Sequence, residues 1–302
     1  MGMEGEMKDK KIAASGIFCT LLGGILWGFS GTCGQFLFQN YGVNTRWLTT
    51  VRMISAGLIL IALGIIKERN NMIGIWRNKR DALRLVVFAV LGLMFCQLAY
   101  MQAISHSNAG TATVLQNLGP AIIMISSCIL LKKLPRRGEV AAIGLALLGV
   151  FILSTHGDIH SMILTKEGLF WGILAAIGAA LYTMLPVNIM KQWGSVPVTA
   201  YGMFIGGIVL GIGSRAWTEY TPLDTKGIVA LIAICFLGTV VAFTLFLQGV
   251  KTIGAVKASM LGTIEPVSAA MIMVIWLDTE LIWIDILGFC CILMTVFILS
   301  KN

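Results

Sequence analysis

The chain contains runs of apolar residues that are too long to be buried in a soluble domain. A helix needs about 20 such residues to cross about 30 Å of hydrocarbon. The sequence has ten runs of this kind, at 15–38, 47–66, 84–104, 109–131, 138–154, 168–190, 197–214, 227–249, 256–277 and 284–300. The connections between them are too short to form separate domains. The runs therefore predict an all-α integral membrane protein with ten transmembrane helices.

The amino-acid composition argues against a water-soluble protein. Charged residues make up 12% of the chain and hydrophobic residues 57%, whereas soluble domains have roughly 25% charged residues. The seven cysteines all lie in apolar runs and lack CxxC or Cys/His zinc spacing, which is typical of buried free thiols. We therefore expect neither a metal nor a cofactor.

The lysines and arginines predict the orientation in the membrane. The formal net charge is +8, and the basic residues are concentrated in every second connection, beginning with the N-terminal tail. Cytoplasmic connections of membrane proteins carry an excess of lysine and arginine. We therefore expect a multi-pass protein of the cytoplasmic membrane with both termini in the cytoplasm. Its basic clusters would face the membrane surface and not a nucleic acid.

The sequence repeats itself after 146 residues. This shift aligns the third to fifth runs with the eighth to tenth, and it places V-F-I-L-S at 150–154 on the identical segment at 296–300. Each copy has five runs, an odd number, so the second copy must enter the membrane inverted. Inverted repeats are typical of secondary transporters, although an old duplication without alternating access would leave the same pattern. We expect a tail at 1–14, a five-helix repeat at 15–154, an external linker at 155–167 and a second five-helix repeat at 168–300.

Several short motifs resemble those of a known family. They are L-W-G at 26–28, R-M-I-S-A-G at 52–57, N-L-G-P at 117–120, T-I-E-P at 263–266 and D-T-E-L…L-G at 278–288. In order and spacing the chain resembles the EamA-type transporters of the drug/metabolite transporter superfamily. The resemblance implies ten helices in an inverted five-plus-five repeat and the transport of small metabolites, often amino acids. One departure is that the first half has Lys132 and Lys133 near the place that corresponds to Glu280.

Glu265 is the only acidic residue firmly inside a predicted span. A charge at the bilayer centre costs at least about 2.5–3.5 kcal/mol, so this carboxylate must be paired, protonated or exposed to a cavity. It could carry a coupling proton or bind a substrate amine, because desolvation favours the neutral form of a carboxylate. Alternatively, it supports a helix that Pro266 breaks by removing a backbone donor.

Pro120 and Pro266 occupy equivalent positions in the two copies. Breaks in corresponding helices of the two halves indicate a binding site near the membrane midplane. Polar residues precede both prolines, Gln116 and Asn117 in the first copy and Thr263 in the second. Polar groups in lipid are costly without partners, so we expect these side chains to face inward. There they either contact substrate or hydrogen-bond between helices.

Other side chains could form the walls of the same site. Gln97 and Tyr100 are three residues apart on one predicted helix face, and Trp27 and Tyr182 would add aromatic walls. Core packing or lipid contact is the alternative for these aromatic residues. The substrate-binding residues that we expect are Trp27, Gln97, Tyr100, Gln116, Asn117, Tyr182, Gln248, Thr263 and Glu265.

Two further features have competing interpretations. Arg52, near the start of the second run, either snorkels to the outer interface or attracts an anionic group. The H-G-D-I-H segment at 156–160 could bind a metal weakly, but its position favours a solvated loop.

These features favour a secondary carrier for a small organic metabolite, an amino acid or a related compound. We expect alternating access and outward transport, either coupled to protons or as a facilitator or exchanger. The sequence has no G-x-x-x-x-G-K-[ST] phosphate loop that would indicate ATP-driven transport. The expected partners are the substrate, the lipid bilayer and protons, with the chain as a monomer or weak dimer. An intramembrane enzyme, a channel and a membrane scaffold are the alternatives.

Overall fold

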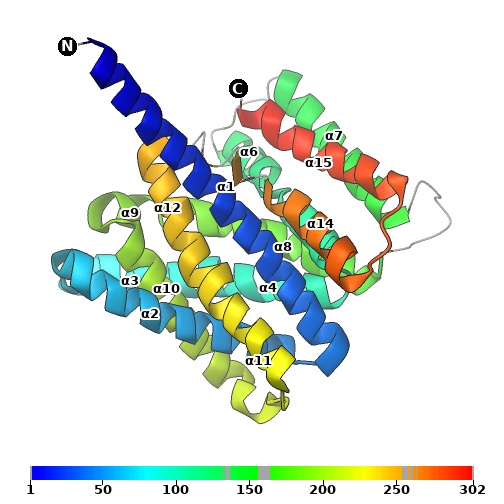
Figure 1. The fold of residues 1–302 in the computed structure, drawn as a ribbon, viewed down its shortest axis with the longest axis horizontal. Helices are drawn as coiled ribbons and strands as arrows, with labels where there is room; N and C mark the ends of the chain where they lie inside the picture. The colour runs from blue at the N-terminus through cyan, green and yellow to red at the C-terminus, as the bar shows by residue number, and fades with distance from the viewer. Residues whose placement is uncertain are drawn as a thin grey trace.

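The computed structural model describes residues 2–130, 132, 137–155, 164–253, 258, 261–262 and 264–300. All regular structure in these residues is helical (Figure 1). Thr263 and the segment 156–163, which contains His156 and His160, lie outside the described residues.

The helices of the first half coincide with the apolar runs. They are α1 (Gly2–Tyr41), α2 (Thr45–Gly74), α3 (Lys79–Val87), the π-helix η1 (Phe88–Met94), α4 (Phe95–Ser105), α5 (Ala109–Gln116), α6 (Gly119–Leu130) and α7 (Arg137–Thr155). From Lys79 to Ser105 the helix is continuous, with η1 in its middle. The run predicted at 109–131 is divided, because α5 ends at Gln116 and α6 begins at Gly119.

The second half has a similar order of helices. They are α8 (Lys166–Met184), α9 (Val187–Trp193), α10 (Ser195–Ser214), the 3-10 helix η2 (Ala216–Glu219), α11 (Thr225–Ile232), the π-helix η3 (Ala233–Val241), α12 (Ala242–Ile253), α14 (Ile264–Leu277) and α15 (Trp283–Ser300). In its described residues, each half thus has a π-helix inside a longer helical segment. Such insertions are frequent at functional sites.

Polar residues at the starts of the helices explain why they begin where they do. The Asn44 side chain accepts a hydrogen bond from the Arg46 amide at 2.8 Å, and Asn108 accepts one from the Thr111 amide at 2.8 Å. Asp224 does the same for the Gly227 amide at 2.9 Å. A side-chain oxygen in this position satisfies a backbone donor that has no partner within the helix. The caps define the starts of α2, α5 and α11.

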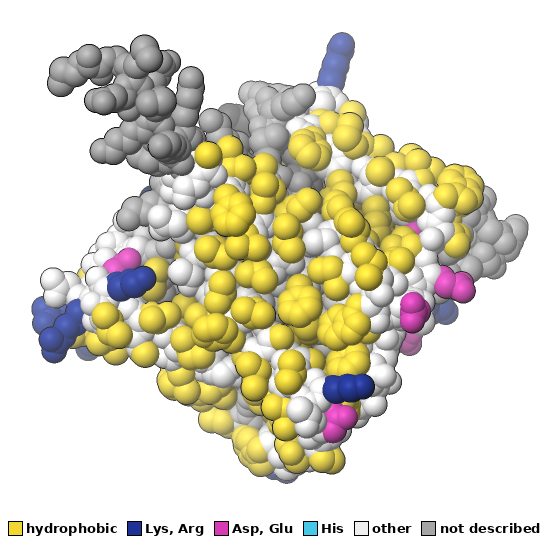
Figure 2. Space-filling view, viewed as in Figure 1, with side chains coloured by type: hydrophobic (Ala, Val, Ile, Leu, Met, Phe, Trp, Pro, Cys, Tyr) yellow, Lys and Arg dark blue, Asp and Glu magenta, His cyan; other side chains and the backbone are white. Residues whose placement is uncertain are grey.

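Six helical segments among the described residues are long and apolar enough to cross a membrane. They are Ala14–Tyr41, Thr45–Gly74, Lys79–Ser105, Lys166–Met184, Ser195–Ser214 and Thr225–Val250. The apolar helices Val140–Leu153, Ile264–Leu277 and Trp283–Thr295 are shorter. Figure 2 shows hydrophobic side chains over most of one face, with charged side chains towards its margins. The chain is therefore an all-helical membrane protein, and the number of ten spans remains a prediction.

The helices pack in related pairs from the two halves. α1 lies against α12 and α14, while α8 lies against α4 and α5. α2 packs on α10, and α7 packs on α15 (Figure 1). The interior of the molecule is thus built from both halves together.

Gly28 allows α1 and α14 to come into backbone contact. A Cβ atom at this position would lie 2.7 Å from both the Glu265 carbonyl oxygen and the Ala269 amide nitrogen. These separations are shorter than van der Waals contact, so any larger residue would push the helices apart. Small residues permit this kind of close helix contact in membranes. The contact places Glu265 beside α1.

Candidate functional site

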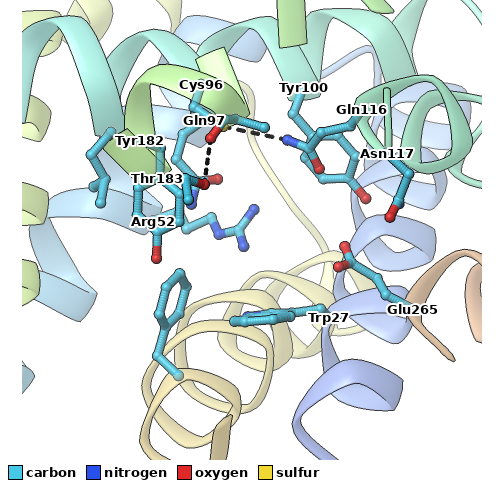
Figure 3. Close-up of a pocket in the computed structure, with 13 residues that line it drawn as sticks. Trp27, Arg52, Cys96, Gln97, Tyr100, Gln116, Asn117, Tyr182, Thr183 and Glu265 are labelled. Atoms are coloured by element: carbon cyan, nitrogen blue, oxygen red, sulfur yellow. Dashed lines mark hydrogen bonds between the residues drawn. The ribbon is translucent and has the colours of Figure 1, made fainter. Parts of the chain in front are cut away.

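A cavity of about 230 Å³ lies between the two halves of the chain (Figure 3). Its volume is below the roughly 300–1,000 Å³ of pockets for drug-sized ligands. Its lining combines aromatic, amide and charged side chains. The lining residues are Trp27, Arg52, Leu93, Cys96, Gln97, Tyr100, Gln116, Asn117, Ala179, Tyr182, Thr183, Phe243 and Glu265.

Aromatic rings form part of the cavity wall. The Trp27 ring of α1 contacts Phe243 with 5.0 Å between centroids and Phe246 with 4.7 Å, both on α12. Tyr182 of α8 stacks on Phe88 with 5.9 Å between centroids. These contacts restrain the rings, so they present a fixed apolar surface to a ligand.

The polar wall comes from α4 and the end of α5. Thr113 donates its hydroxyl hydrogen to the Ala109 carbonyl at 2.7 Å. Because a threonine hydroxyl has one hydrogen, the Tyr100 hydroxyl must be the donor in its 2.8 Å hydrogen bond with Thr113. Asn117 donates to the Thr113 carbonyl at 2.8 Å, directly after α5 ends. The break before Pro120 therefore positions an amide at the cavity.

Gln116 lies next to this group. Its Nε2 contacts the Cys96 sulfur at 3.4 Å, which joins α5 to α4 (Figure 3). Gln97 lines the cavity from the same turn of α4 as Cys96. The wall therefore presents amide groups, which can donate and accept hydrogen bonds.

Glu265 is in the first turn of α14, and its carboxylate faces the cavity (Figure 3). The positive end of a helix dipole favours a negative charge in this position. Within the described part of the chain, no ion pair includes Glu265. Pro266 follows it in the first turn of α14 and is buried.

Arg52 of α2 also lines the cavity, and only 4% of its surface is exposed. Its Nε donates to the Thr239 hydroxyl at 2.9 Å. Of the two interpretations of Arg52, the one in which it snorkels to the interface is therefore wrong. Arg52 lies seven residues into α2, about 10 Å from the start of the helix, and its side chain points between helices.

Most of the residues predicted to bind substrate line this cavity. Trp27, Gln97, Tyr100, Gln116, Asn117, Tyr182 and Glu265 all line it. Gln248 does not, because it lies five residues beyond Phe243 on α12 and faces a second cavity. Thr263 lies outside the described residues, and Pro120 is the second residue of α6.

Sequence reasoning left some lining residues out of the predicted set. Cys96 lies one helical turn before the predicted residue Tyr100, and Thr183 follows the predicted residue Tyr182, so these neighbours could have indicated both. Phe243 had no polar neighbour of this kind in its apolar run. Arg52 did carry a signal, since it is a charge within an apolar run.

The second cavity has a volume of about 670 Å³ and lies beside the first. Lys67 and Glu68 line it near the end of α2, and Lys191 lines it from α9. Phe243 borders both cavities. Phe243 is thus the residue that the linings of the central cavity and of this larger, partly charged space have in common.

Hydrogen bonds join the helices where α1 ends. Gln35 accepts from the Ala109 amide at 2.8 Å and donates to the Thr279 hydroxyl at 3.1 Å. Tyr41 donates to the Asp224 carboxylate. This bond, together with the Gly227 amide, lowers the pKa of Asp224, because both donors favour its charged form. These contacts link α1 to α5, to the connection after α14 and to the start of α11.

The sequence matches one protein family along almost its whole length. The model of the EamA-like transporter family matches residues 14–155 and again residues 166–301. The chain is also 35% identical over 287 residues to the uncharacterized inner membrane transporter YicL of Salmonella typhimurium, covering 95% of each chain. An uncharacterized transporter of Archaeoglobus fulgidus is 23% identical over 271 residues, covering 89% of this chain and 91% of that protein.

A solved crystal structure has a similar fold. It aligns with a TM-score of 0.62 and 16% sequence identity, covering 97% of this chain and 99% of the other. At this identity the similarity concerns the fold alone.

Proposed function

The chain belongs to the EamA-like transporter family, and on this premise we propose that it moves a small organic metabolite by alternating access. The family and the relatives are named as transporters, which are not enzymes. We assign an amino acid or a related compound as the substrate and outward movement as the direction. The carrier works either with protons as the coupling ion or as a facilitator or exchanger.

One observation carries this proposal, namely that the central cavity lies between the two halves. Trp27, Tyr100 and Asn117 contribute to its lining from the first half, and Tyr182 and Glu265 from the second. A site at the interface between two halves is exposed to one side or the other when the halves rock. Its small volume and mixed lining suit a polar metabolite with an apolar part.

The arrangement of the helices supports an inverted five-plus-five repeat. The packing of α1 on α12 and α14 corresponds to the packing of α8 on α4 and α5. The 146-residue shift moves η1, at 88–94, onto 234–240, which falls inside η3. Equivalent π-helices and equivalent contacts are what two copies of one folding unit would produce.

The two cavities suggest how access would alternate. Rotation of the Phe243 side chain would join the central cavity to the larger space lined by Lys67 and Lys191. The hydrogen bonds of Gln35 and the Tyr41–Asp224 contact lie at the opposite end, where α1 ends. They would break when the cavity opens towards that end. Phe243 is thus the gate that we assign to one end of the pathway.

We expect both termini and the end with Lys67 to be cytoplasmic, because basic residues are retained on that side. In a cysteine-free background, an impermeant maleimide should label Asp224→Cys in intact cells. It should label Arg77→Cys only after the membrane is permeabilised. Labelling of Arg77→Cys in intact cells would mean that the orientation is the opposite of the one proposed.

Flux into proteoliposomes tests the transport function. We expect saturable uptake of at least one member of a panel of labelled L-amino acids, with a rate that depends on an imposed pH difference if protons are coupled. A channel would instead show no saturation, and a scaffold would show no flux. Either result would contradict the proposal.

A further inference from the structure

The Arg52 guanidinium is a buried charge whose hydrogen-bonding capacity is incompletely used. Its Nη1 is buried and has no hydrogen-bonding partner among the described residues. The Nε1 atom of Trp27, which lines the same cavity, is also a buried donor without an acceptor in the described part of the chain. Buried donors normally have partners, because an unsatisfied donor is costly. The cavity therefore has a surplus of donors that a ligand with acceptor atoms would satisfy.

The position of Arg52 is held from the opposite half of the chain. Thr239 in the π-helix η3 donates its hydroxyl hydrogen to the Ile234 carbonyl, five residues earlier, at 2.9 Å. Its oxygen is then oriented to accept from the Arg52 Nε at 2.9 Å. With Nε engaged in this way, the guanidinium borders the cavity on the side towards Glu265 (Figure 3), while its Nη1 is covered.

Glu265 lies close enough to attract this charge, but it is not in direct contact with it. Both side chains line the cavity, yet among the described residues neither takes part in an ion pair. One positive and one negative group thus face the same small space without meeting. A ligand with a single negative group balances Arg52, whereas a dianionic phosphate would leave an excess negative charge beside Glu265.

We propose that Arg52 is the anchor for a carboxylate group of the transported substrate. The inference rests on the transport function proposed above and deepens it, because it states which chemical group the cavity requires. A guanidinium binds a carboxylate through charge-assisted hydrogen bonds that a neutral amide cannot reproduce. Amines and neutral compounds with the same side chain are therefore poor substrates.

Binding to the purified full-length protein tests this requirement. The probes are L-phenylalanine, L-leucine and L-threonine, each compared by calorimetry with its carboxamide and its decarboxylated amine. For at least one of these side chains, the wild type should bind the amino acid about tenfold or more tightly than the carboxamide. In Arg52→Gln this ratio should fall to about one through loss of the carboxylate ligand. Arg52→Lys should keep part of it, since the charge remains without the planar fork.

Arg46→Gln is the matched control, because Arg46 lies on the same helix but is exposed and pairs with Glu219 at the surface. It should leave the ratio unchanged. If Arg52 had a purely structural role, its substitution would weaken the binding of all probes equally. The ratio of amino-acid affinity to carboxamide affinity would then stay at the wild-type value. If Arg52→Gln does not fold, the affinity ratios of the wild type and of Arg52→Lys still test whether Arg52 binds the carboxylate.

The failure of this inference is distinct from the failure of the transport proposal. Saturable flux combined with equal affinity for amino acids and carboxamides would overturn the role of Arg52 and leave the transporter function in place. No flux of any amino acid, carboxamide or amine would overturn both, since the anchor rests on transport.

Discussion

Glu265→Gln is expected to abolish accumulation driven by a pH difference while leaving the protein folded and able to bind substrate. Proton coupling needs a group that changes its protonation state inside the membrane and responds to the substrate. Glu265 lines the central cavity without an ion-pair partner among the described residues. Glutamine keeps the size and hydrogen bonding of the side chain but cannot take up a proton. We expect exchange of internal for external substrate to continue.

The measurement is flux into proteoliposomes with and without a pH gradient, together with the melting temperature of each protein. Glu280→Gln is the control, because Glu280 is an exposed carboxylate in the connection that follows α14. A structural role for Glu265 would lower expression and melting temperature and leave coupling normal in the remaining protein. Normal gradient-driven flux in Glu265→Gln would rule out Glu265 as the proton carrier.

Gly28→Ala is expected to destabilise the protein and to lower transport even though it adds a single methyl group. The new Cβ would lie 2.2 Å from the Ser268 Oγ and 2.7 Å from two backbone atoms of α14. The serine side chain can rotate away, but the backbone atoms cannot, so α1 and α14 must separate. Overpacking of this kind costs about 1–3 kcal/mol. Separation of the two helices would also displace Glu265 from the cavity.

Gly144→Ala is the matched control, because among the described residues no atom outside the nearby backbone of α7 lies within 4 Å of a Cβ at this position. Alanine has a higher helix propensity than glycine, so this variant should be at least as stable as the wild type. Thermal unfolding in detergent and initial transport rates compare the two variants. A wild-type melting temperature in Gly28→Ala would mean that α1 and α14 are not in backbone contact.

Much of the candidate site could be predicted because polar residues are rare in apolar runs. Gln97, Gln116 and Asn117 interrupt apolar segments, and each must find a polar surrounding inside the protein. All three line the central cavity. The internal repeat and the two prolines indicated where such a cavity should be. These arguments need only local sequence and the cost of polar groups in lipid.

Gln248 is a residue for which the argument from polar residues in apolar runs did not predict the correct cavity. It is as polar as Gln97, yet it lines the second cavity. Which face of α12 meets the centre depends on how that helix rotates against α1. That rotation results from packing at contacts such as Trp27 with Phe243, which are distant in sequence.

The sequence by itself determined that this chain is a helical membrane protein and which family it belongs to, and it indicated where most of the described helices lie. These properties depend on the length of apolar runs and on motifs within single segments, since a bilayer requires each span to be apolar along its own length. Only the tertiary structure decided that Arg52 is buried, that Thr239 orients it and that Phe243 lines both cavities. These features join helices far apart in the sequence, and their geometry is set by packing between helices.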